Sequence, residues 1–239
     1  MAPPEGEHAR PLRPPGPAGG ATGGSLAQRA YAALREAILD LTLPPGSRLR
    51  KGEVCAALGV SRSPVAEAVA RLRAEALVDV VPQAGTFVAR LSMDEVREGA
   101  FLREALELAA VEAVAARATD TDLRALRRDL RRQEALVAEG DLDGFYAADA
   151  AFHEAILGLT GHRRVAHLAQ TAWVHVNRAR RLLLPEPGRL AETLAEHAAI
   201  VATLEARDAL AARAATRAHL AQVLSRLEPL ARARPELFS

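Results

Sequence analysis

Residues 58–72 read LGVSRSPVAEAVARL, a glycine turn followed by an amphipathic segment. At 100° per residue, Val65, Val69 and Leu72 fall on one narrow apolar stripe. Pro64 stands in the first turn, where its missing N–H costs little. The stretch predicts a helix that starts abruptly after a tight turn and packs through one aliphatic face.

The flanking sequence completes a small domain around this helix. Residues 26–39 (LAQRAYAALREAIL) are amphipathic, and 53–58 (EVCAAL) form a short apolar segment. Residues 78–91 (VDVVPQAGTFVARL) alternate like two short strands about a glycine-containing turn. Three helices and a β-hairpin within 26–92 predict a winged helix-turn-helix.

The rest of the chain has helical periodicity and no strand pattern. A capping box at Ser92–Glu95 starts the first helix, and breaks near Gly161 and Gly188 separate later ones. We expect a mainly α protein in which 93–235 form an antiparallel bundle of six or seven helices. Residues 1–25 are rich in Pro and Gly and are expected to be a disordered tail.

Composition narrows the class of protein. The single Cys55 excludes an internal disulfide, and no apolar run approaches the length of a membrane span. We therefore expect a cytoplasmic protein with no membrane partner. Residues 26–92 carry nine Lys and Arg against six Asp and Glu, which weakly favours nucleic-acid contact there.

The sequence DAAFHEAI (149–156) places two polar groups on an apolar helical face. Asp149 and His153 are four residues apart and project from the same side. His197 and His219 lie on, or at the edge of, the inward stripes of two later helices. Each alone is best explained as a hydrogen-bonded core residue. Together they predict a divalent metal site, with zinc most favoured and nickel or manganese as alternatives.

The order and spacing of LPPGSRL, LGVSRSPVAEAVARL, ALV and PQAGTFV across 26–92 resemble the DNA-binding domain of the GntR family of bacterial regulators. The helical remainder resembles the FCD-type ligand-binding domain of the FadR subfamily. The resemblance implies a homodimeric regulator, usually a repressor, that binds a double-stranded operator. With the residue chemistry, it selects these candidate DNA contacts: Arg50, Lys51, Ser61, Arg62, Ser63, Arg73, Gln83 and Gly85.

Two departures from the family pattern lie on the expected DNA face. Ala66 stands where the family usually has a DNA-contacting arginine, and Ala84 stands beside the wing glycine where a basic residue is common. Each loss removes a cationic donor, so we expect a weaker or differently specified operator.

The resemblance also extends to the polar groups of the helical region. One branch of the family carries a metal site from Asp-x-x-x-His, a His in E-H-x-x-I and a late His, which DAAFH, EHAAI (196–200) and RAHL (217–220) match. In that branch the metal lies in a pocket that commonly takes small organic acids. Arg103, Asn177 and Arg178 are the candidate effector contacts, although Arg103 is equally suited to an ion pair with Glu107.

Two other functions compete with this interpretation. A metal-dependent hydrolase would use the same ligands to activate water, but it needs a general base, and no further carboxylate stands out beside the cluster. A binding protein with a purely structural metal is the second alternative. The hydrolase also leaves the winged helix unexplained.

Overall fold

The computed structural model describes residues 24–183 and 185–239, and of residues 166, 167 and 170–172 the backbone alone. The expected tail lies outside this range except for Gly24 and Ser25. Ser25 is the N-cap of the first helix, because its Oγ accepts a hydrogen bond from the Gln28 amide at 3.1 Å.

The described chain forms two compact units. Unit 1 comprises the residues up to Leu91 together with Arg234–Ser239, and unit 2 comprises Ser92–Ala233. The elements of unit 1 are α1 (Leu26–Leu39), α2 (Lys51–Leu58), α3 (Arg62–Ala74), β1 (Val78–Val81), β2 (Gly85–Val88) and a 3-10 turn (Pro235–Leu237). Those of unit 2 are α4 (Met93–Arg117), α5 (Asp120–Glu139), α6 (Leu142–Leu159), α7 (Arg163–Ala172), α8 (Val174–Leu183), α9 (Arg189–Glu205) and α10 (Ala209–Ala233).

Unit 1 is the predicted winged helix-turn-helix. Helix α3 packs on α1 and α2, and Val65, Val69 and Leu72 are buried as the stripe predicts. Burying each of these side chains contributes about 1.5–3 kcal/mol. Gly59 ends α2 in the left-handed region at φ 64, a conformation that glycine adopts without a Cβ penalty.

The wing is a two-stranded antiparallel hairpin in which Val78 pairs with Val88 and Val81 with Gly85. The segment before α2 extends it, because the Leu49 amide donates to the Thr86 carbonyl at 2.8 Å. The C-terminal residues also belong to this unit, since the Leu91 amide donates to the Leu237 carbonyl at 2.9 Å. The sequence did not predict that return of the chain.

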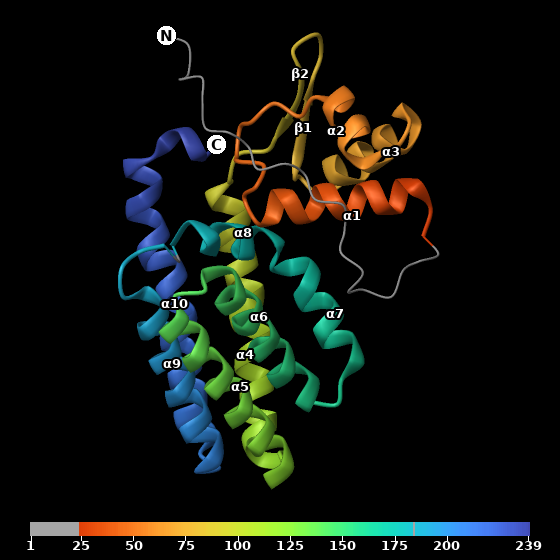
Figure 1. Cartoon of the computed structure of the whole chain (residues 1–239). Helices are drawn as coiled ribbons and strands as arrows, with labels where there is room; N and C mark the ends of the chain where they lie inside the picture. Colours follow the sequence, from red (N-terminus) through yellow and green to blue (C-terminus); the bar gives the residue numbers. More distant parts are fainter. Residues whose placement is uncertain (1–23, 184) are drawn as a thin grey trace. The chain divides into compact units, whose positions relative to one another are not determined.

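Unit 2 is all-helical, as predicted, and α4 is its central helix. Helix α4 contacts α6, α7, α8, α9 and α10, and runs beside α10, while α5 packs on α6 and α9 (Figure 1). The core between them is aliphatic and aromatic, with Val111, Phe152, Ile156, Ile200 and Leu204 all buried.

Polar side chains cap the starts of several helices in unit 2. Ser92 caps α4, where the sequence predicts a helix start. Thr119 closes a capping box with Asp122 at the start of α5, and Asp141 caps α6. One break was missed, because the segment after Gly161 divides at Trp173 into α7 and α8. In unit 1, Ser61 occupies the N-cap position of α3, but its side chain makes no capping hydrogen bond.

Among the described residues, no helix combines the length and apolar character needed to cross a bilayer.

Candidate functional site

Three helices of unit 2 bring the four predicted metal ligands together in its interior. Asp149 and His153 come from α6, His197 from α9 and His219 from α10, and all four are at most 5% exposed. One ligand nitrogen from each histidine lies within 4.8 Å of the others. The helical spacing that predicted convergence in the sequence therefore corresponds to a real cluster.

Each histidine has its Nδ1 atom occupied by a hydrogen bond to a neighbouring oxygen. His153 Nδ1 lies 2.7 Å from Glu107 Oε2, and His219 Nδ1 lies 2.6 Å from Glu196 Oε2. His197 Nδ1 lies 2.7 Å from Gln133 Oε1. These acceptors place the ring proton on Nδ1, so the lone pair of each Nε2 is left for another partner.

The Nε2 atoms and one carboxylate oxygen then face one another. His153 Nε2 lies 3.2 Å from His219 Nε2, and His197 Nε2 lies 3.5 Å from Asp149 Oδ1. Among the described atoms, His197 Nε2 and Asp149 Oδ1 are buried and make no hydrogen bond. Lone pairs directed at one another in a buried space are unfavourable unless a cation lies between them, so this donor set fits a metal ion.

Electrostatics keep the imidazoles of His153 and His197 neutral and the Asp149 carboxylate ionised. Burial lowers the pKa of His153 to about 4, against the opposing effect of Glu107, and burial holds the pKa of His197 well below its usual range. Burial alone would raise the pKa of Asp149, but the Arg180 guanidinium, together with smaller effects of His153, His197 and Arg103, outweighs burial and lowers this pKa. These are the protonation states that a metal requires of its ligands.

Three residues that orient the histidines were not selected from the sequence. Glu107, Gln133 and Glu196 each hold one imidazole, and Glu107 and Gln133 are at most 1% exposed. The expectation that no further carboxylate stands beside the cluster is therefore wrong. Both carboxylates nevertheless already have partners. Glu107 pairs with His153 and Arg103, and Glu196 pairs with His219 and Arg189.

The three candidate effector contacts occupy different places. Arg103 donates from Nε to Glu107 Oε1 at 2.6 Å, and both side chains are almost completely buried, which is the ion pair considered as its alternative role. Asn177 is half-buried and its carbonyl accepts from the Tyr146 hydroxyl at 2.6 Å. Arg178 is fully buried on α8.

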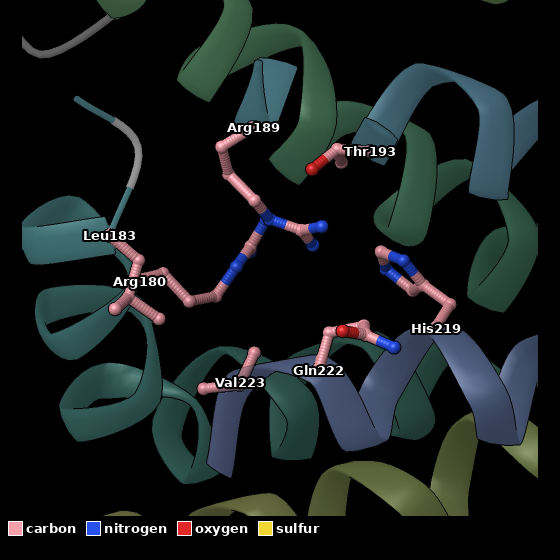
Figure 2. A pocket seen from close by; sticks show the side chains of 7 residues that line it. All are labelled: Arg180, Leu183, Arg189, Thr193, His219, Gln222 and Val223. Atoms are coloured by element: carbon pink, nitrogen blue, oxygen red, sulfur yellow. The ribbon is translucent and has the colours of Figure 1, made fainter. Parts of the chain in front are cut away.

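A small pocket opens beside His219. Its free volume is about 20 Å³, room for about one water molecule. Figure 2 shows Arg180 and Arg189 extending into it from α8 and the start of α9. Among the described residues the lining is Arg180, Leu183, Arg189, Thr193, His219, Gln222 and Val223, without Arg103, Asn177 or Arg178. The Thr193 hydroxyl is buried and makes no hydrogen bond with another described atom.

Unit 1 presents the predicted DNA-reading residues at its surface. Ser61, Arg62 and Ser63 are exposed together at the N-terminus of α3, and Lys51 is exposed at the start of α2. Arg50 is also exposed, but its guanidinium pairs with Glu53 at 2.9 Å. The start of the reading helix is thus the densest group of donors.

The other candidate DNA contacts lie away from the N-terminus of α3. Arg73 is exposed eleven residues after Arg62 on α3, which separates the two by roughly 16 Å along the helix axis. Gln83 lies in the wing turn at φ 63, and Gly85 has φ 130. Gly85 thus has a backbone reason to be glycine, independent of any contact with DNA.

Arg48 is a basic residue of the wing that sequence reasoning missed. Its guanidinium lies 3.2 Å from where a Cβ on Gly85 would stand, and the side chain is exposed. The segment carrying it pairs with Phe87 of β2. A positive charge therefore accompanies the wing glycine although Ala84 itself is neutral.

Comparison with known proteins covers both units. Residues 26–88 match the family model described as "Bacterial regulatory proteins, gntR family", and residues 98–222 match the FCD domain. An HTH-type transcriptional regulator in an unstable DNA locus of Streptomyces ambofaciens is 38% identical over 87% of this chain and 88% of its own. The transcriptional repressor RspR of Escherichia coli is 28% identical over 89% of this chain and 93% of its own.

Solved structures agree with these matches. A GntR transcriptional regulator from Rhodococcus sp. RHA1 has a TM-score of 0.71 and 28% identity over 84% of this chain and 99% of its own. The Escherichia coli protein McbR/YncC shares the fold, with a TM-score of 0.73 and 24% identity over 87% of this chain and 99% of its own.

Proposed function

Because the chain belongs to the GntR family of transcriptional regulators and carries an FCD domain, we propose that it is a metal-containing, effector-controlled repressor. In this proposal 26–92 bind a double-stranded operator, and 93–235 bind a small carboxylate effector. The protein acts as a homodimer in the cytoplasm, since two reading heads suit a pseudo-palindromic operator.

The observation that carries the metal part is the orientation of the three imidazoles. Each Nδ1 is held by an oxygen of another residue, and the Nε2 atoms of His153, His197 and His219 are turned toward a common space that Asp149 shares. Two ligands of a tetrahedral zinc ion lie about 3.3 Å apart. The 3.2 and 3.5 Å separations of the donor atoms support zinc first, with nickel or manganese as alternatives.

Charge balance supports an anionic effector. Without a metal, the negative charges of Asp149 and Glu107 are neutralised by Arg180 and Arg103. His153 and His197, whose pKa values are lowered, are uncharged. When bound, a divalent ion supplies two uncompensated positive charges and a coordination position that a carboxylate can occupy. Arg180, Arg189 and the Thr193 hydroxyl would bind and orient the rest of such a molecule.

The residues of unit 1 have separate tasks in the proposal. Arg62 reads a base edge in the major groove, because its guanidinium matches the paired acceptors of guanine. Ser61, Ser63 and Lys51 hold phosphates, and Arg48 adds a charge beside the wing. The effector changes operator affinity by the coupling free energy between the two sites. That RspR is named a repressor favours this sign of regulation.

Selection from a random DNA library tests the function. We expect the purified protein to enrich a pseudo-palindromic sequence at low salt. Arg62→Ala should weaken binding to that sequence roughly 5–150-fold. Arg117→Ala removes an exposed charge from unit 2 and should leave DNA affinity unchanged. Failure of the wild-type protein to enrich any sequence would overturn the proposal that this chain is a DNA-binding regulator.

A further inference from the structure

Arg180 contacts the candidate metal ligand and the candidate effector pocket at the same time. Its side chain is 9% exposed on α8, its NH2 atom donates to Asp149 Oδ2, and its guanidinium lines the pocket (Figure 2). The other oxygen of the same carboxylate, Oδ1, faces His197 Nε2 at 3.5 Å. The Asp149 carboxylate therefore binds the Arg180 guanidinium with one oxygen and faces the space between the imidazoles with the other.

Two effects of Arg180 on a metal ion would oppose each other. Its hydrogen bond orients Asp149, and orienting partners of metal ligands typically raise affinity 10–100-fold. Its positive charge draws electron density from the carboxylate and repels a divalent ion nearby, an interaction weakly screened in a buried site. The repulsion between a buried unit charge and a nearby divalent ion is larger in free energy than the gain from one orienting hydrogen bond. We therefore expect Arg180 to weaken metal binding.

The pocket supplies a reason for this arrangement. Its free volume of about 20 Å³ holds little more than a water molecule, so an organic acid cannot enter unless a lining side chain moves. Arg180 is a lining cation whose partner inside the protein is a carboxylate. An entering carboxylate offers Arg180 an equivalent partner and can replace Asp149.

We propose that Arg180 is an internal competitor of the metal for Asp149, which weakens metal binding until an anion in the pocket draws the guanidinium away. The inference rests on the metal site of the proposed function and adds a coupling residue to it. By reciprocity, the metal strengthens binding of the anion by the same factor. Metal and effector then bind cooperatively through one side chain.

Zinc binding to the metal-stripped full chain tests this, measured by calorimetry with a competing chelator. Arg180→Gln removes the charge and is expected to bind zinc at least about tenfold more tightly than wild type. Arg180→Lys keeps a cation beside Asp149 and should stay near wild type. Arg181→Gln is the matched control, because the neighbouring Arg181 pairs with Asp143, away from the cluster.

The sign of the change separates this role from a structural one, since a loosened site would bind zinc more weakly. Equal or weaker binding by Arg180→Gln would overturn the inference, as would equal tightening in Arg180→Lys. If Arg180→Gln is less stable than wild type without zinc, the zinc-induced rise of its thermal midpoint must exceed that of wild type. A smaller rise, or no folding with zinc, overturns it.

The outcomes distinguish this inference from the proposed function. If wild type binds zinc and Arg180→Gln does not bind it more tightly, Arg180 does not compete with the metal, but the proposed metal site is still supported. Absence of zinc binding in both proteins refutes both, while the operator selection decides separately whether the chain binds DNA.

Discussion

The two units place their functional groups in opposite environments. In unit 1 the candidate DNA contacts are exposed, and Thr86 is the one buried polar side chain among its described residues. Unit 2 encloses charged and polar groups within its core: Arg103, Glu107, Gln133, Asp149, His153, Arg178, Arg180, Arg189, Thr193, His197, Thr216 and His219. An exposed contact can change without loss of the fold, whereas a buried one contributes to stability and function together.

The largest expected effect of a single substitution is at the buried ion pair between Arg103 and Glu107 in unit 2. Arg103→Met leaves a buried carboxylate without its cation and should destabilise unit 2 by about 3–5 kcal/mol. Denaturant unfolding followed by the fluorescence of Trp173, the single tryptophan, measures it. Arg213→Met breaks the more exposed pair with Glu112 and should cost at most about 1 kcal/mol. Equal losses in the two variants would contradict the contrast.

Acid should destabilise unit 2 through its buried histidines. The pKa of His153 is about 4 in the folded, metal-free protein and near 6.5 unfolded. As pH falls from 6.5 to 4, the unfolded chain takes up the proton first, so stability is lost by about 3 kcal/mol. The stabilisation is fully present above pH 6.5. Trp173 unfolding curves between pH 7 and 4.5 measure it, and a flat profile would refute the neutral buried imidazole.

Removing a partner of one histidine should weaken the metal site without removing a ligand. Gln133→Leu deletes the oxygen that orients His197 and should lower zinc affinity about 10–100-fold. Glu134→Gln changes the exposed neighbour on α5 and should have no effect. If the two variants bind zinc alike, the orienting role of Gln133 is wrong.

The smallest expected effect is on the exposed face of unit 1. Ala66→Arg adds a cation on the outward side of α3, where one more phosphate contact should steepen the dependence of log affinity on log salt by about 0.9. Binding titrations across salt concentrations measure the slope. Folding of unit 1 should not change, and an unaltered slope would show that Ala66 does not face the DNA backbone.

The sequence predicted what depends on local spacing. The stripe of Val65, Val69 and Leu72, the turn at Gly59 and the shared face of Asp149 and His153 all follow from helical geometry. The pairing of those groups with partners far along the chain does not. Gln133 reaches His197 across 64 residues, and nothing in the sequence around either residue indicates the contact.

Two further misses have physical causes. The break between α7 and α8 falls at Trp173, without the glycine or proline that usually marks a helix end. The C-terminal strand-like residues join unit 1 through Leu91 and Phe238, a pairing set by tertiary contacts. Glu107 was visible as a neighbour of Arg103, and its closeness to His153 emerges only when α4 packs on α6.

Elemental analysis of the purified protein tests the central claim most directly, that four inward groups of unit 2 form a metal site. Wild type should carry one equivalent of a divalent metal per chain, and the double variant His153→Ala/His197→Ala should carry almost none while retaining its helical circular dichroism spectrum. Equal metal content in the two proteins would contradict the four-ligand site.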